Sequence, residues 1–206
     1  MIVRTLTAGP AQTNAYLVGC DRTNAAVVID PCWDAPAILA EAQSHHLAIQ
    51  LILITHGHFD HIGAAADLKD ATGAPIALHR RDVDWLYVNG GADVFGIKIR
   101  TVPEPDRLLE HGDKIDVGTL SFEARLAPGH TAGHVVFVEQ AEHAAFVGDV
   151  LFAGSIGRTD LPGGDYDTLI ESIQAQLLSL PDDFKVYPGH GPPTTIGIER
   201  KTNPFL

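Results

Sequence analysis

The feature that most constrains this 206-residue chain is an apolar run that ends in a cluster of ionisable side chains. Residues 51–54 read LILI without a polar break, which is typical of a β-strand buried on both faces. Shortly after this run come His56, His58, Asp60 and His61, four ionisable groups within six positions. Burying such a cluster is costly unless a cation neutralises it. The pattern therefore predicts a metal site at the end of a buried strand.

Three later strands also end beside glycine and a residue that can bind a metal. The ligand candidates at these strand ends are His130, Asp149 and His190. A glycine next to each of them lets the backbone turn sharply, so that the side chain can face inward. Imidazole nitrogen and carboxylate oxygen are ligands that suit zinc, iron and manganese. Four strand ends therefore present five imidazoles and two carboxylates, which we expect to converge.

The number of candidate ligands indicates two metal ions. Seven donors exceed what one tetrahedral ion accepts, but they match two ions that share one carboxylate and a bridging hydroxide. Gly57 interrupts both strand and helix geometry, so a tight loop can direct two histidines at one ion and Asp60 with His61 at the other. We expect two divalent ions, zinc in first place and iron or manganese as alternatives, with a net site charge that stabilises a developing oxyanion.

Other ionisable residues have open or simpler interpretations. His134 either orients a metal ligand by a hydrogen bond or only begins the next strand. Arg158 follows Asp149 in a glycine-rich loop, where it either binds a substrate carboxylate or pairs with Asp160 or Asp165. Five further histidines stand alone and are expected in turns or at the surface: His45, His46, His79, His111 and His143.

Composition limits the partners that we expect. The chain has 14 Lys and Arg against 26 Asp and Glu, a formal net charge of −12, which argues against nucleic acid or an anionic membrane as partner. No apolar run approaches the ~20 residues of a membrane span, and the N-terminus lacks the apolar core of a signal peptide. We expect a cytoplasmic protein that acts on a small molecule; the composition assigns no oligomeric state.

The hydrophobic pattern predicts two successive groups of strands with a few helices. In the first half we expect strands at residues 2–7, 14–18, 25–30, 51–55 and 74–78, with helices at 34–47 and 62–72 and a helix or turn at 80–87. Residues 89–105 are expected to be irregular and lid-like. In the second half we expect strands at residues 107–109, 114–117, 120–126, 135–139, 143–147 and 184–187, and a helix at 166–180. This content favours two sheets packed face to face with helices outside.

Four motifs resemble those of the metallo-β-lactamase-fold hydrolases: THGHFDH from Thr55, PGHTAGH from Pro128, VGD from Val147 and PGHG from Pro188. Their order is that of the superfamily, and the resemblance covers the whole chain. It implies an α+β fold, a four-layer αββα sandwich, with a binuclear site along one edge. The segments GRTDLPGGD at 157–165 and TIGIERKTNPFL at 195–206 resemble the short glyoxalase II-like, or hydroxyacylglutathione hydrolase, subgroup. The C-terminal helical domain of longer glyoxalase II enzymes has no counterpart here, so we expect residues 1–206 to form one domain.

Carried over to this sequence, the resemblance implies a role for each candidate ligand. It implies a hydrolase that cleaves S-D-lactoylglutathione or a related hydroxyacyl thioester by attack of a metal-bridging hydroxide. Asp60 has a catalytic role in this scheme, because it can also hold the proton of the hydroxide. The leaving thiolate has a conjugate pKa of about 8.5 and departs without prior protonation. One ion would bind His56, His58 and His130, and the second Asp60, His61 and His190, with Asp149 between them.

Three other functions are compatible with parts of the pattern. Persulfide dioxygenases resemble this chain in fold and in the GRTD segment, but use one iron held by two histidines and one aspartate, here His56, His130 and Asp149. Hydrolysis of another ester, a lactone or a β-lactam would use the same attack. A non-catalytic binding module would be marked by a lost ligand, whereas all seven positions are filled.

Overall fold

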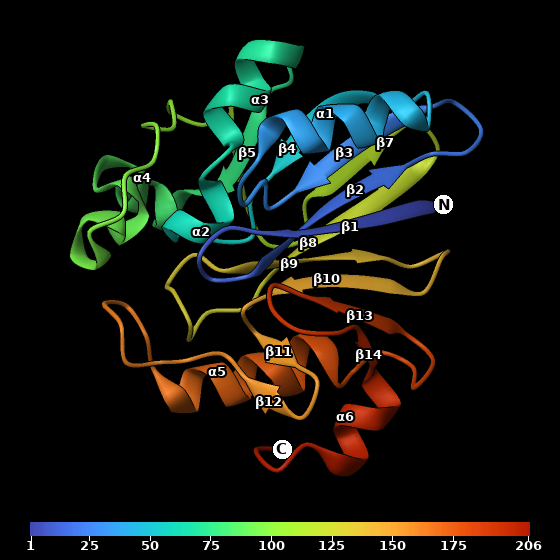
Figure 1. Ribbon diagram of the computed structural model, residues 1–206. Coiled ribbons are helices and arrows are strands. Elements are labelled where there is room, and N and C mark those ends of the chain that lie inside the picture. The colour runs from blue at the N-terminus through green and yellow to red at the C-terminus, as the bar shows by residue number, and fades with distance from the viewer.

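The computed structural model describes residues 1–206, which form two six-stranded sheets between layers of helices (Figure 1). The strand order is β1-β2-β3-β4-β5-β6 in the first sheet and β14-β13-β10-β9-β8-β7 in the second. Helices α1 and α3 lie outside the first sheet, and α5 and α6 lie outside the second. The expected α+β fold, a four-layer αββα sandwich, is confirmed.

The first sheet combines an antiparallel and a parallel part. Strands β1 to β3 are antiparallel, whereas β3, β4, β5 and β6 run parallel to one another. Its strands are β1 (Ile2–Ala8), β2 (Thr13–Gly19), β3 (Ala25–Ile29), β4 (Ala48–Leu53), β5 (Ile76–His79) and β6 (Arg107–Leu109). Helices α1 (Ala35–Ser44) and α3 (Ala65–Thr72) cover its outer face.

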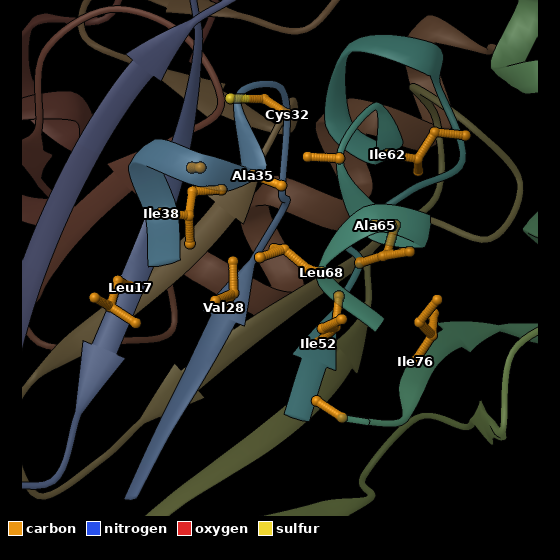
Figure 2. Packing of buried hydrophobic residues seen from close by; sticks show 14 of the residues in the cluster. Leu17, Val28, Cys32, Ala35, Ile38, Ile52, Ile62, Ala65, Leu68 and Ile76 are labelled. Carbon is orange, nitrogen blue, oxygen red and sulfur yellow. The ribbon is translucent and has the colours of Figure 1, made fainter. Parts of the chain in front are cut away.

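Strand β4 shows why the apolar run has no polar break. Ile52 packs in the outer core with Ile38 of α1 and Leu68 of α3, as Figure 2 shows. Leu51 and Leu53, on the opposite face of the strand, pack in the core between the two sheets. Because both faces of the strand are covered, every position favours an apolar residue.

The second sheet is mostly antiparallel, with one parallel pair formed by β10 and β13. Its strands are β7 (Lys114–Val117), β8 (Leu120–Leu126), β9 (Val135–Glu139), β10 (Ala144–Gly148), β13 (Lys185–Pro188) and β14 (Thr194–Thr195). Helix α5 (Tyr166–Ser172), its continuation η3 (Ile173–Leu177) and α6 (Ile196–Thr202) cover it. The helical face predicted from Leu169, Ile173, Leu177 and Leu180 is buried, as expected.

Some elements differ from the prediction. Residues 62–72 form no single helix, since α2 (Phe59–Ile62) ends at Gly63 and α3 begins later. A Cβ atom on Gly63 would lie 2.3 Å from the carbonyl oxygen of Cys32, so the break brings the chain against a neighbouring loop. Residues 80–95 form three short helical segments, η1 (Arg80–Asp82), α4 (Val83–Tyr87) and η2 (Asn89–Phe95). The prediction did not include the short strands β11 (Leu151–Phe152), β12 (Ser155–Ile156) and β14, nor helix α6.

The fold brings the ligand loops to one edge of the sandwich. Strand β4 of the first sheet leads into the first histidine cluster, while β10 and β13 run parallel and lead to Asp149 and His190. Strand β8 leads to His130 from the same sheet. None of the helices combines the length and the apolar character that crossing a bilayer requires.

Candidate metal centre

Three histidines form the first group of possible metal ligands. His56 follows β4, His58 precedes α2 and His130 follows β8, and all three are buried. One ring nitrogen from each lies within 4.8 Å of the other two. The Nε2 atom of His130 is 3.2 Å from Nε2 of His56 and 2.9 Å from Nδ1 of His58. Three nitrogen donors therefore face one small volume, an arrangement that suits a cation.

Asp60, His61 and His190 form the second group. One donor atom from each of them lies within 4.8 Å of the other two. The Nδ1–H of His61 donates to Asp30 Oδ2 over 2.9 Å, which directs its Nε2 into the group. This Nε2 atom lies 3.5 Å from Asp60 Oδ2, and Nε2 of His190 lies 3.3 Å from the same oxygen. The group thus combines nitrogen and oxygen donors, as divalent-metal sites do.

Asp149 lies between the two groups. Its Oδ1 atom is 3.3 Å from Nε2 of His61, while its Oδ2 atom is 3.4 Å from Nε2 of His190 and 3.7 Å from Nε2 of His130. Asp149 also forms a compact set of donors with His56 and His61. This position is the one expected of a carboxylate shared by two ions. The structure therefore brings all seven predicted donors together.

The environment of these donors fits divalent cations. Nε2 of His61 and Oδ1 of Asp149 are buried without a hydrogen-bond partner, which is rare for buried polar atoms. Nδ1–H of His130 donates to the carbonyl oxygen of Arg158 over 2.8 Å, so its Nε2 lone pair is free to face the first group. Such outer hydrogen bonds typically orient histidines that bind a metal.

The two groups hold protons differently in the metal-free chain. Burial, together with the nearby His130, lowers the pKa of His58 to about 3. Burial also disfavours the charged form of His190, but hydrogen bonds to Asp149 and Asp60 outweigh it and raise the pKa of His190 to about 9. The pKa of His61 is likewise raised well above 6.5, because three carboxylates outweigh its burial. At neutral pH a cation must therefore displace protons from the second group, and metal affinity there rises with pH.

Glycine beside the ligands is required by close approach. A Cβ atom on Gly189 would lie 2.2 Å from Oδ1 of Asp149, inside the contact distance of any real side chain. A Cβ atom on Gly57 would lie 2.5 Å from Cβ of Trp85. Gly189 therefore lets the His190 loop pack against Asp149, and Gly57 lets the first ligand loop pack against α4.

Asp30 supports the centre from behind, and the sequence interpretation did not include it. It is buried at the end of β3 and accepts hydrogen bonds from the backbone N–H and the hydroxyl of Thr55, both over 2.7 Å. The Thr55 hydroxyl in turn lies 3.0 Å from Nδ1 of His56. Asp30 therefore fixes His61 directly and His56 through Thr55. The sequence signal that could have identified Asp30 is a carboxylate directly after the apolar residues 26–29.

Asp82 is a second buried carboxylate that the sequence interpretation missed. It lies in η1 and accepts hydrogen bonds from N–H of Gly57 over 3.0 Å, from the hydroxyl of Thr131 over 2.7 Å and from N–H of Gly133 over 2.7 Å. Burial raises the pKa of Asp82, although these donors partly oppose the shift. Asp82 thereby joins the loop that carries His56 and His58 to the loop that carries His130.

The structure distinguishes the alternatives for His134 and Arg158. His134 is fully buried, stacks on His56 with ring centroids 4.7 Å apart, and accepts a hydrogen bond from the backbone N–H of Asp149 over 3.0 Å. This contact favours the orienting role. The guanidinium of Arg158 donates twice to Asp160, over 2.7 and 2.8 Å, which is the ion pair considered from the sequence. Five isolated histidines are expected in turns or at the surface. One of them, His79, is instead buried, and its ring accepts a hydrogen bond from the backbone N–H of Arg81 at the start of η1.

The fold and the centre together define a class of metallo-hydrolase. Two face-packed sheets with outer helices carry five histidines and two aspartates at one edge. These residues form one group of three histidines and a second group of Asp60, His61 and His190, with Asp149 beside both. The chain belongs to the metallo-β-lactamase superfamily, whose family model matches residues 8–190. Proteins of this superfamily bind divalent metal ions, as the donor groups found here require.

Proteins that are similar to this chain carry names that state different activities or metals. The hydroxyacylglutathione hydrolase GloC of Haemophilus influenzae is 42% identical over 198 residues, which cover 95% of this chain and 93% of that protein. The crystal structure of BLEG-1, a B3 metallo-β-lactamase, is 42% identical with a TM-score of 0.94 and coverage of 100% and 99%. The crystal structure of TTHA1623 in a di-iron-bound form is 43% identical with a TM-score of 0.91 and coverage of 99% and 100%.

Proposed function

We propose that this chain hydrolyses thioesters, with S-D-lactoylglutathione or a related hydroxyacyl thioester as substrate. The observation that carries the proposal is the pair of donor groups with Asp149 between them at the base of a cleft. Two divalent ions, zinc in first place, would lower the pKa of water toward ~7 and polarise the carbonyl oxygen. The similarity to GloC of Haemophilus influenzae supports a hydroxyacyl thioester as substrate.

The residues of the chain orient the reaction and handle the proton. Oδ2 of Asp60 accepts a hydrogen bond from the Thr13 hydroxyl over 2.8 Å, which fixes the carboxylate on the cleft side of the second group. In this position the ionised Asp60 can accept a hydrogen bond from the attacking water and so hold its O–H group in place. Burial alone would raise the pKa of Asp60, but the neighbouring His61 and hydrogen bonds hold it at about 2, so the acceptor is ionised at neutral pH. A thiolate leaves without an acid, since its conjugate pKa is about 8.5.

Hydrolysis of a β-lactam or lactone is the second candidate. It requires the same attack at a carbonyl, and the similarity to the BLEG-1 B3 metallo-β-lactamase supports it. Oxidation by a single iron on His56, His130 and Asp149 has less support, because it would leave the compact donor group of Asp60, His61 and His190 without an ion.

An assay of the metal-loaded protein on three substrates tests the proposal. We expect turnover of S-D-lactoylglutathione with kcat/KM above about 10⁴ M⁻¹ s⁻¹, weaker hydrolysis of a chromogenic cephalosporin, and no oxygen uptake on glutathione persulfide. Oxygen uptake without thioester turnover would favour the dioxygenase. A kcat/KM for the cephalosporin at least tenfold above that for the thioester, a difference on the order of 1.4 kcal/mol, would favour β-lactam hydrolysis.

A further inference from the structure

The cleft above the metal centre is larger than a lactoyl group requires. Its volume is about 570 Å³, within the range of pockets that bury a whole small ligand. Its base is formed by five of the seven donors: His58, Asp60, His130, Asp149 and His190. The walls therefore contact whatever the substrate carries beyond the scissile bond.

One wall of the cleft is an apolar surface formed by Trp85, Val94 and Phe95, which we call the apolar wall. Trp85 meets the His58 ring edge-on, with centroids 4.6 Å apart, and Phe95 lies 5.4 Å from the ring of Phe59. Val94 and Phe95 are nevertheless 85% and 53% exposed. Adjacent exposed apolar side chains at the mouth of a pocket are typical of a binding surface.

The segment that carries Val94 and Phe95 packs closely against the loop that carries the ligands. A Cβ atom on Gly90 would lie 2.2 Å from the backbone nitrogen of Phe59, so η2 rests directly on the start of α2. Gly90 has a positive φ of 64°, which glycine adopts without strain. This packing places the wall beside His58 and Asp60, which line the same cleft.

Outside the metal centre, the cleft offers no free lysine or arginine to a carboxylate. Arg158 is the only Lys or Arg among the residues that line it, and its guanidinium already donates twice to Asp160. A glutathione group carries two carboxylates and one ammonium, so its recognition would require such cations. The chain as a whole has a net charge of −12, which further disfavours an anionic carrier.

Building on the proposed thioester hydrolysis, we propose that the apolar wall is a subsite for an uncharged, apolar substituent of the thioester. The carboxylates of a thiol carrier such as glutathione are not recognised by the cleft. The substituent belongs to the acyl group or to the thiol, and the chemistry that binds it is the same in both cases. Each methylene buried against the wall should raise kcat/KM about fourfold until the wall is covered.

Two series of uncharged thioesters test the proposal and separate the two sources. The first varies the acyl chain from acetyl to hexanoyl on N-acetylcysteamine, and the second keeps the lactoyl group and varies the alkanethiol from ethyl to hexyl. We expect kcat/KM to rise in one series, which then identifies the side that meets the wall. Two flat or falling series would overturn the proposal.

Variants of the wall provide the matched comparison. In the double variant Val94→Ser, Phe95→Ser, kcat/KM should rise by less than about twofold per methylene, because the apolar contact is lost. Ile198→Ser replaces an apolar residue that is 52% exposed and does not line the cleft, and it should leave the rise unchanged. Arg158→Gln should change KM for S-D-lactoylglutathione less than about twofold, whereas a tenfold increase would show carboxylate recognition and contradict the proposal.

Binding of unreactive thioethers separates the subsite from hydrolysis. S-alkyl-N-acetylcysteamines from ethyl to hexyl should bind with a Kd that falls about fourfold per methylene, followed by the fluorescence of Trp85. The double wall variant should lose this dependence. If the dependence is found but no thioester is cleaved, the subsite stands and the proposed function fails. If thioesters are cleaved without any chain-length dependence, the proposed function stands and the subsite fails.

Discussion

Replacing Asp60 by asparagine, or His58 by alanine, is expected to lower thioester hydrolysis by at least about 10³-fold, comparable with the loss of an oxyanion-stabilising group. Asp60→Asn keeps the shape of the side chain but removes the negative charge that faces Nε2 of His61 at 3.5 Å and Nε2 of His190 at 3.3 Å. His58→Ala removes one of the three nitrogens of the first group. The measurement is kcat/KM on S-D-lactoylglutathione for metal-loaded protein.

A control separates this effect from a general loss of structure. His143 pairs with Asp183 at the surface, outside both donor groups, so His143→Ala should keep hydrolysis within about twofold. Circular dichroism should show the same secondary structure for all three variants. Wild-type hydrolysis by both Asp60→Asn and His58→Ala would contradict the proposed function.

The second large effect is expected at Asp82, which touches no substrate and acts through the ligand loops. Asp82→Asn should weaken the ion held by His56, His58 and His130 about 10- to 100-fold, as loss of an outer hydrogen-bond partner commonly does. Asparagine has one acceptor oxygen, so its amide nitrogen would face either the Gly133 N–H or the donors of Gly57 and Thr131. Competition with a chromophoric chelator measures the two metal affinities separately.

Two neighbouring carboxylates serve as comparisons for Asp82. Asp84→Asn, an exposed change in α4, should leave both affinities unchanged. Asp30→Asn should weaken both ions, because Asp30 holds His61 directly and His56 through Thr55. Equal weakening of both ions by Asp82→Asn, or no weakening, would show that Asp82 does not act on the first group alone.

Local patterns predict the layers of this fold because each strand reflects the surfaces that cover it. The apolar run of β4 indicates two covered faces, and the spacing of Leu169, Ile173 and Leu177 indicates one buried helical face. Short elements such as β11, β12 and α6 contain too few residues to show a period. The break at Gly63 depends on a contact with Cys32, thirty-one positions earlier, which no local pattern contains.

In the metal centre, too, local patterns predict some residues, whereas others depend on contacts between distant parts of the chain. The seven donors can be predicted because they follow the ends of apolar strands, five of them directly beside a glycine and the other two, Asp60 and His61, in the same cluster as His56 and His58. Asp82 could not be predicted, since its partners Gly57 and Thr131 are 25 and 49 positions away and become neighbours only in the folded sheets. The ion pair of Arg158 with Asp160 was one of two alternatives, and only the structure distinguishes them.

Calorimetric titration of the metal-free protein with zinc tests the two-ion centre most directly. At neutral pH, and in buffers with different enthalpies of ionisation, we expect two zinc ions per chain. The ion at the second group should displace protons from His61 and His190, because neighbouring carboxylates outweigh burial and raise the pKa of both side chains. A single equivalent of zinc, or binding without any proton release, would contradict the two-group centre.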